Sequence, residues 1–349
     1  NMARFYRFLS RSVSTAQAPR QLLLVAILLL AGLTGSCGTA EERLEISIGA
    51  MAPGTSWYVF GATLASLLQE ALPENSRVEV IARGGGVGNP ILVDRGDETI
   101  ALAQTFTSSW AYHGEPGVYR GKKHSNLRAL VGGLNSVWVT AILQQEFIDR
   151  TGYDTLEQVL LSDQPIRVVM KPQGSSVPLL VDLIFELLGT SRERIESRGG
   201  RIIQVTANQI PSLLRDGGAD LYFETALRGH PSVTEVTRTI DVRFIDMPGN
   251  VLSKLSERGI HSSSMPHWFK GQSGPTQAIE LGTVVIAHQA LSSDLAYLIT
   301  KTICENKDRM AKAHKAWIDF DPAQSGSAEK TGIPLHPGAQ RYYREKGWL

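Results

Sequence analysis

The chain has 349 residues, 42% of them hydrophobic and 20% charged, so it is long enough to bury a substantial core and too long for one typical domain. Its 35 basic and 34 acidic residues give a formal net charge of +1. This balance argues against a dedicated nucleic-acid binder, because such proteins usually carry a strongly basic face. Two lobes are therefore the expected organisation.

The first 36 residues are typical of a bacterial export signal. Four arginines and no acidic residue precede an apolar run at 22–33, which is short for a membrane span. Small residues and Cys37 follow this run and resemble a lipobox, in which the cysteine is acylated and becomes the mature N-terminus. We expect a lipoprotein signal peptide at 1–36 and a polar tether at 37–43. Cleavage nearby and a retained signal anchor are the alternatives.

After the tether, short β-rich runs alternate with amphipathic helices, which is the pattern of open α/β sheets. Apolar residues at helical spacing predict helices around 59–68 and 179–188. The expected strands are 44–48, 77–81, 100–103, 137–143, 166–170, 202–205, 221–223, 242–245 and 283–287. This order predicts two open sheets flanked by helices.

Two of these strands are predicted to cross between the lobes. Runs 137–143 and 283–287 are almost unbroken apolar segments that separate groups of strand–helix units. They predict a first lobe at 44–138, a second lobe at 139–282, and a return to the first lobe with a C-terminal docking segment at 283–349. Two crossing strands form a natural hinge.

Two strand–loop–helix junctions carry matching polar residues. Hydroxyl groups and free backbone N–H groups at the positive end of a helix can bind an anion without a formal cation. Simple helix capping by the same hydroxyls is the alternative, and it is compatible with binding. The residues expected to contact a ligand at the two junctions are Thr55, Ser56, Trp57, Tyr58, Ser175 and Ser176.

A glycine-rich segment at 84–90 is predicted to be a turn that brings Asn89 to the ligand. It does not match a dinucleotide fingerprint, because Asn89 stands at the third glycine position, and it lacks the lysine–hydroxyl pair of a phosphate loop. Glu224 comes just after the predicted strand 221–223, so we expect it at the edge of a cleft. There it would accept hydrogen bonds from a ligand or remain a solvated carboxylate.

Signatures of catalysis and of metal binding are missing from the sequence. The eight histidines show no HExxH or comparable spacing, and residues 271–275 end in proline where a nucleophile elbow needs glycine. We therefore expect a binding protein without catalytic residues, cofactor or metal. No arginine stands out as a carboxylate clamp; the candidate cations are Arg83, Lys171 and Arg228. Cys304 lies in an apolar helical pattern and is predicted to be a small buried side chain.

Several segments resemble the TAXI family, the solute receptors of one class of TRAP transporters. The resemblance runs from about residue 44 to residue 349 and is carried by ALAQ at 101–104, GSS at 174–176 and LHPGA at 335–339. It implies a type II-like periplasmic-binding fold with two lobes joined by two hinge strands. From the lipobox at Cys37 we expect a lipid-anchored protein in the periplasm or at the cell surface, and we expect a monomer. That receptor would capture a small carboxylate, such as a glutamate- or glutamine-like amino acid or a dicarboxylate, for TRAP membrane subunits.

The sequence departs from the family pattern at several of these positions. Ser176 replaces a glycine, Thr105 follows Gln104 where serine is common, and Glu224 lies where the family is often apolar. These departures predict a ligand other than the family's usual one. The alternative functions are a ligand-sensing lipoprotein of a signalling system and, as a second alternative, an enzyme on the same two-lobed scaffold. By position, the resemblance favours as ligand neighbours Tyr58, Asn89, Gln104, Ser175 and Ser176.

Overall fold

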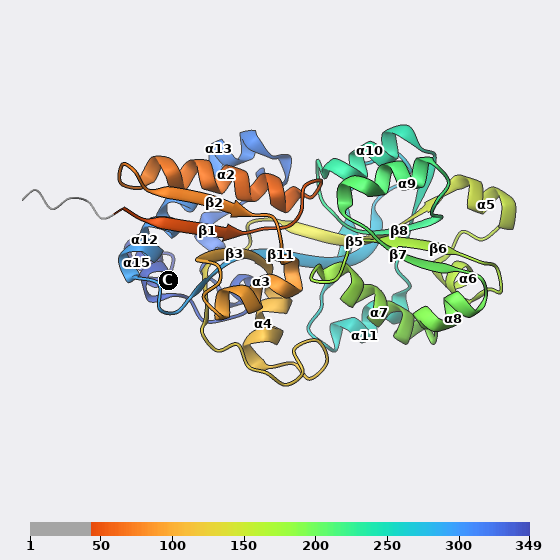
Figure 1. Cartoon of the computed structure of the whole chain (residues 1–349), viewed down its shortest axis with the longest axis horizontal. Helices are drawn as coiled ribbons and strands as arrows, with labels where there is room; N and C mark the ends of the chain where they lie inside the picture. The colour runs from red at the N-terminus through yellow and green to blue at the C-terminus, as the bar shows by residue number, and fades with distance from the viewer. Residues whose placement is uncertain (1–42) are drawn as a thin grey trace, which may run out of the picture. The chain divides into compact units, whose positions relative to one another are not determined.

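The computed structural model describes residues 43–349, and the structural statements below concern that part of the chain (Figure 1). The predicted signal peptide, its cleavage site and Cys37 lie outside the described residues. From residue 43 onward, no helix is both long enough and apolar enough to cross a membrane.

The strands of residues 43–349 follow one path of hydrogen-bonded neighbours, β2-β1-β3-β11-β5-β8-β6-β7, with β4 and β10 on β11 and β9 on β5. Their bounds are β1 (Glu45–Gly49), β2 (Arg77–Ile81), β3 (Ile100–Gln104), β4 (Leu127–Val131), β5 (Ser136–Gln144), β6 (Arg167–Met170), β7 (Arg201–Gln204), β8 (Leu221–Ala226), β9 (Val242–Ile245), β10 (Ser262–Met265) and β11 (Thr276–His288).

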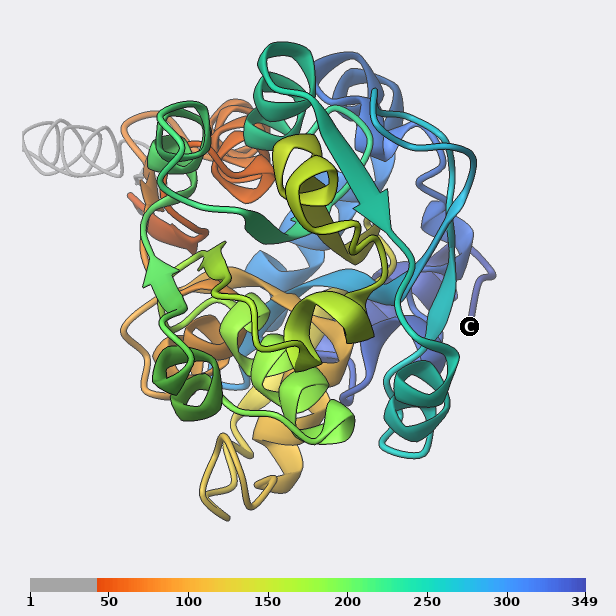
Figure 2. The same ribbon diagram turned by 90° about the vertical axis from the view of Figure 1, so that its right-hand side faces the viewer.

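Helices cover both faces of the strands (Figure 1), and the view from the end that carries β6 and β7 shows them on opposite sides (Figure 2). They are α2 (Ser56–Ala71), α3 (Gly85–Asp94), α4 (Thr105–His113), α5 (Gln145–Thr151), α6 (Leu156–Leu161), α7 (Ser176–Leu188), α8 (Arg192–Ser197), α9 (Ile210–Arg215), α10 (Pro231–Thr239), α11 (Gly249–Ser256), α12 (Ser293–Glu305), α13 (Lys307–Ala313), α14 (Ala328–Thr331) and α15 (Pro337–Glu345). Single 3₁₀ turns are η1 (Ala207–Gln209), η2 (Lys315–Trp317) and η3 (Pro322–Gln324).

Strand β11 links the two groups of strands. Its residues from Thr283 to Ala287 pair antiparallel with β3, while Ile279 to Gly282 pair antiparallel with β5. We call the part that contains β1 to β4, with the C-terminal segment from α12 to α15 that packs on it, lobe 1, and the part that contains β6 to β10 lobe 2. The fold is the α/β architecture expected from the alternation of strands and helices.

Each of the nine predicted strands overlaps an observed one, but β4 and β10 were not predicted. In β4 the charged side chain of Arg128 interrupts a short apolar run, and β10 consists of three serines and a methionine. β11 also begins seven residues earlier than expected, at Thr276. Pairing with β10 and with β5 holds residues 276–282 extended, although three of the seven are polar or charged, so tertiary contacts outweigh local sequence there.

Two local predictions are corrected by the structure. The glycine-rich segment at 84–90 is not only a turn, because helix α3 begins at Gly85 after two glycines with positive φ. Glu224 does not follow its strand but lies within it. β8 continues to Ala226, where pairing with β5 places Glu224 opposite Thr140.

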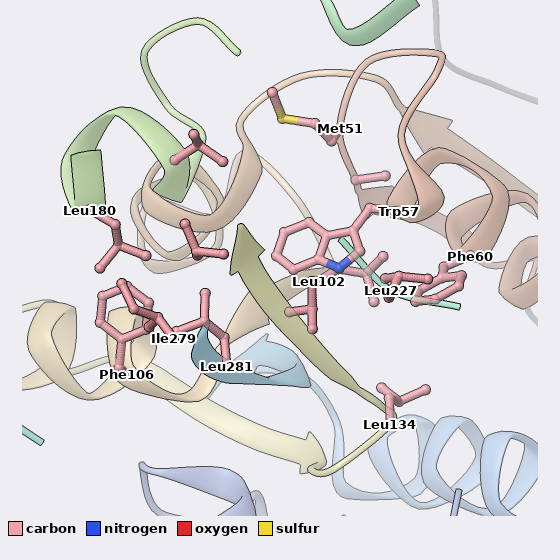
Figure 3. Close-up of a cluster of buried hydrophobic side chains, with 14 of the residues drawn as sticks. Met51, Trp57, Phe60, Leu102, Phe106, Leu134, Leu180, Leu227, Ile279 and Leu281 are labelled. Carbon is pink, nitrogen blue, oxygen red and sulfur yellow. The ribbon is translucent and has the colours of Figure 1, made fainter. Parts of the chain in front are cut away.

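One hydrophobic cluster extends through both lobes. It includes Phe60 and Leu102 of lobe 1 together with Leu180 of lobe 2, all fully buried. Where the lobes meet, Trp57 at the start of α2 lies beside Leu227 after β8 (Figure 3). The two lobes therefore bury apolar side chains against each other.

Cys304 is buried in α12, which confirms its predicted position in the core. Burial raises the pKa of its thiol to about 12. A thiol that stays protonated at neutral pH is a poor nucleophile, so Cys304 acts as a small apolar side chain.

Candidate functional site

A small cavity lies between the lobes where helices α2 and α7 begin. It offers about 20 Å³ to the centres of water molecules, which is room for about one water. The lining residues are Met51, Thr55, Ser56, Trp57, Gly86, Gln104, Val137, Lys171, Ser175, Ser176, Thr225, Leu227 and His230.

Backbone contacts hold the lobes together on one side of this cavity. The N–H groups of Val87 and Gly88, in the first turn of α3, donate to the Gly174 carbonyl at 2.9 and 3.2 Å. Lobe 2 thus supplies an acceptor for helix-terminal donors that have no partner inside α3. Gly174 has a φ of +96°, and a methyl group there would lie 2.5 Å from the Gly84 carbonyl oxygen. Only glycine fits this contact without displacement.

A second contact closes the cavity from the α2 side. The Ser232 hydroxyl of α10 donates to the Gly54 carbonyl at 2.8 Å. Gly54 has a φ of +89°, and a methyl group there would lie 2.6 Å from the backbone nitrogen of Asn208. Both glycines thus allow the two backbones to approach each other across the lobe boundary.

Of the four predicted residues at the start of α2, three line the cavity and one does not. Thr55 is the N-cap, and its hydroxyl accepts from the Tyr58 N–H at 3.2 Å. Ser56 is buried on the cavity wall, and its hydroxyl has no hydrogen-bond partner among the described residues. Trp57 adds an apolar wall, whereas Tyr58 does not line the cavity and its side chain is 38% exposed.

The start of α7 faces the same cavity from lobe 2. Ser175 is the N-cap and accepts from the Val177 N–H at 3.2 Å, and Ser176 is the first helical residue. Neither α2 nor α7 has an acidic residue in its first turn. The partial positive charges of both helix ends therefore remain available to a negative group in the cavity.

Gln104 lies on the lobe 1 wall at the end of β3 and is buried. Its Oε1 has no hydrogen-bond partner in the described part of the chain. A methyl group on Gly86 would lie 2.0 Å from this oxygen, so the glycine makes room for the amide. A buried amide oxygen without a donor is unfavourable by about 1–3 kcal/mol, which a ligand N–H or O–H would offset.

Asn89 lies behind the cavity wall and is fully buried. Its Nδ2 donates to the carbonyl oxygens of Ala50 and Leu102 at 3.0 and 2.7 Å, and its Oδ1 accepts from the Gly85 N–H at 3.1 Å. These bonds fasten the start of α3 to the chain after β1 and to β3. In this arrangement Asn89 supports the wall and does not line the cavity.

Glu224 is also behind the wall, beneath Lys171, which does line the cavity. The Lys171 ammonium forms an ion pair with Glu224 Oε1 and donates to Thr225 Oγ1 at 2.7 Å. Tyr222 donates to Glu224 Oε2 at 2.6 Å. Burial alone would raise the pKa of Glu224, but the charge of Lys171 and the hydrogen bonds from Lys171 and Tyr222 lower it overall, so the carboxylate is ionised.

His230 is the N-cap of α10 and also lines the cavity. Its Nδ1 accepts from the Val233 N–H at 3.3 Å, so in the neutral ring Nε2 carries the proton. Nε2 lies 4.0 Å from Glu224 Oε2. Burial lowers the pKa of His230 to about 4, which keeps the ring neutral at pH 7. His230 was not among the predicted ligand contacts, because its Gly-His-Pro context is that of an ordinary turn before a helix.

The wall thus combines one cation, already neutralised by Glu224, with two helix ends, the polar atoms of Ser56 and Gln104, and an apolar surface that includes Met51 and Leu227. This arrangement can hold a small molecule with one negative group and an apolar part. In residues 43–349, no group of three or more His, Cys, Asp and Glu side chains could hold a metal ion.

The comparisons with known proteins agree with this fold. The model of the NMT1-like family matches residues 48–347. The periplasmic binding protein BugD has a similar structure, with a TM-score of 0.52, 13% identity, and coverage of 88% of this chain and 95% of that one. A protein of Bordetella bronchiseptica RB50 is also similar, with a TM-score of 0.51, 15% identity, and coverage of 86% and 89%. The fold is that of periplasmic binding proteins, and the chain belongs to the NMT1-like family.

Proposed function

We propose that this chain is an extracytoplasmic solute-binding protein of a TRAP transporter of the TAXI type, which captures a small carboxylate between its lobes. The observation that carries the proposal is the pair of buried polar atoms on the cavity wall, Ser56 Oγ and Gln104 Oε1, which have no partner within residues 43–349. A bound solute would satisfy both.

The chemistry of the wall supports a carboxylate as the main recognised group. The Ser56 hydroxyl can donate to a carboxylate oxygen at the positive end of α2, while α7 offers a second positive end. Two or three charge-assisted hydrogen bonds, at about 1.5–3 kcal/mol each, would supply much of the roughly 8 kcal/mol of a micromolar complex.

The Gln104 carbonyl supports a second group on the same solute. A buried amide oxygen accepts hydrogen bonds, so it favours a ligand that carries an ammonium, amide or hydroxyl beside its carboxylate. An amino acid meets both requirements, and a dicarboxylate meets only the first. The proposed contact residues are Thr55, Ser56, Trp57, Gln104, Lys171, Ser175, Ser176 and His230, with Tyr58, Asn89 and Glu224 as supports.

Closure of the lobes on the solute would create the form that the TRAP membrane subunits recognise, and acylation of Cys37 would keep the protein at the membrane surface. The fold of periplasmic binding proteins and the lobe-to-lobe contacts of Gly54 and Gly174 support this cycle. Two lobes that bind a solute between them can separate and close about the connecting strands.

Thermal melting of the purified full chain tests the proposal. The panel contains L-glutamate, L-glutamine, succinate, methylphosphonate and glucose, each added separately. A solute at 100 times its Kd is expected to stabilise the folded state by about 2.7 kcal/mol, which raises the melting midpoint. If glucose raises the midpoint and none of the solutes that carry an acidic group does, the carboxylate assignment is wrong.

A further inference from the structure

A second concave surface lies outside the solute cavity, between α10 of lobe 2 and the end of α13 in lobe 1, both on the upper side of the molecule in Figure 1. Its volume is about 890 Å³. Arg228, Arg238, Lys270 and Lys315 line it, and none of its lining residues is acidic. We call this surface the basic groove.

The charge of the basic groove is unusual for this chain. Without the four arginines and two glutamates of residues 1–42, the rest of the sequence has 31 basic and 32 acidic residues, so it is nearly neutral. Yet Arg228, Arg238 and Lys315 have no carboxylate within 4.0 Å among residues 43–349, while Lys270 pairs with Asp241 at 3.3 Å. The groove therefore carries positive charge that this part of the chain leaves uncompensated.

The groove spans the boundary between the lobes. A methyl group on Gly229 of lobe 2 would lie 3.7 Å from Lys315 Cβ and 3.8 Å from His314 Cε1 of lobe 1, so the two chains are in contact there. Burial lowers the pKa of His314 to about 4, so at pH 7 the charge at this contact comes from Arg228 and Lys315. When the lobes close, the positive charges of Arg228 and Lys315 lie in the same groove. A bound anion would offset the repulsion between them.

One turn connects the basic groove with the solute cavity. Leu227 and His230 line the cavity, whereas Arg228 and Gly229, between them in sequence, line the groove. A molecule bound in the groove thus contacts the same turn that a solute contacts from inside. Such a molecule binds best when solute binding has already placed the turn and lobe 1 together.

We propose that the basic groove docks an acidic segment of a partner protein and recognises the closed lobes. The inference goes beyond the proposed function, and it rests on that function only where the partner is taken to be the membrane part of the transporter. Complementary charge guides such encounters and selects the partner.

Two observations favour an extended acidic segment over a compact anion or a lipid surface. The four cations come from separate parts of the chain, at 228, 238, 270 and 315, and they line a groove with half-buried Trp268, which suits a peptide. The large hydrophobic side chains exposed among residues 43–349 are Tyr58, Leu161, Ile318, Trp348 and Leu349, and none of them lines the groove. A surface that enters a bilayer would need such side chains.

Binding of a fluorescein-labelled octaglutamate peptide to the full chain, followed by fluorescence anisotropy, tests this inference. We expect binding at low ionic strength that weakens as salt is added. The double variant Arg228→Glu, Lys315→Glu should lower the affinity at least about tenfold. Lys122→Glu with Lys254→Glu is the matched control, because both lysines are exposed and line neither the solute cavity nor the basic groove. It makes the same change in net charge, and we expect less than about a twofold effect.

Four outcomes would overturn the inference: no peptide binding at low salt, equal losses in the variant and its control, equally strong binding of octalysine, or displacement by inorganic phosphate at equal charge concentration. Groove-dependent binding to phosphatidylglycerol vesicles without peptide binding would assign the groove to lipid instead. If the double glutamate variant does not fold, Arg228→Gln with Lys315→Gln replaces it.

Solute binding is measured separately on the same proteins by thermal melting. The groove variant should keep the solute-induced shift of the melting midpoint, because neither Arg228 nor Lys315 lines the solute cavity. If no solute shifts any protein while the peptide still requires the groove, the solute-receptor proposal fails and the docking site stands.

Discussion

The ammonium of Lys171 on the cavity wall and the carboxylate of Glu224 behind it form an ion pair, with side chains that are 6% and 0% exposed. Lys171 follows β6 and Glu224 lies in β8, and these strands are parallel neighbours. A buried ion pair adds little net stability, because the loss of hydration offsets the attraction. Its effect here is to hold one ammonium group at a defined place on the wall.

Replacing one residue of the Lys171–Glu224 ion pair should therefore lower the free energy of unfolding more than replacing both. Glu224→Gln leaves the Lys171 ammonium buried without a counter-charge and should lower the free energy of unfolding by about 3–5 kcal/mol. Adding Lys171→Met to Glu224→Gln should recover part of that loss. Urea denaturation of the two single variants and the double variant measures the coupling. If the losses of unfolding free energy in the two single variants sum to the loss in the double variant, Lys171 and Glu224 are not energetically coupled.

His230 makes stability depend on pH. Burial lowers the pKa of His230 to about 4, below the value of about 6.5 for an unfolded histidine. Between these values the unfolded chain binds the proton more tightly, so the stability is present above about pH 6.5 and is lost as the pH falls towards 4. His314, with a pKa also lowered to about 4 by burial, contributes in the same window.

The variant His230→Asn keeps a side-chain acceptor for the α10 N-terminus. The parent protein is expected to lose stability as the pH falls from about 7.5 to about 4.5. The variant should lose about 2–3 kcal/mol less over the same range. Urea denaturation at both pH values provides the measurement. An unchanged pH dependence would mean that His230 is already charged, or accessible to protons, in the folded protein.

Gly174→Ala should weaken solute binding by obstructing closure. The added methyl group would lie 2.5 Å from the Gly84 carbonyl oxygen of the other lobe. The matched control is Gly189→Ala at the C-cap of α7, where φ is also positive, at +78°, and a methyl group meets no atom within 4 Å. Both variants should lose about 1 kcal/mol of stability.

Only Gly174→Ala is expected to lower solute affinity at least about tenfold. Titration with the solute that gives the largest melting shift measures this difference. Equal affinities in the two variants would show that closure tolerates a side chain at this contact.

Ser56→Ala separates binding from stability. The Ser56 hydroxyl is buried without a partner in the described part of the chain, so its removal should change the free energy of unfolding by less than about 0.5 kcal/mol. The loss of a donor to the carboxylate should nevertheless reduce solute affinity by about 1.5–3 kcal/mol. Ser108→Ala is the control, because its hydroxyl is equally buried and unpartnered but does not line the cavity. A similar loss of affinity in both variants would exclude the proposed contact.

The local sequence predicted most of the strands, and it predicted where the two helices at the site begin. β-rich runs alternate with amphipathic ones, so strands such as 77–81 and 242–245 were placed at their observed bounds. Thr55 and Ser175 were identifiable as N-caps, because a hydroxyl residue before an apolar helical pattern satisfies backbone N–H groups wherever the helix lies.

The tertiary structure decided which of these polar residues share a cavity. Glu224, Asn89 and Gln104 were all predicted ligand neighbours, yet strand pairing and packing place the first two behind the wall as supports and leave Gln104 on it. Lys171 meets Glu224 across two parallel strands, and Gly54 meets Ser232 across the lobes. Short-range preferences therefore determine where helices and strands begin. The burial of a charge and the approach of two distant backbones depend on contacts between distant segments, which no local pattern in the sequence encodes.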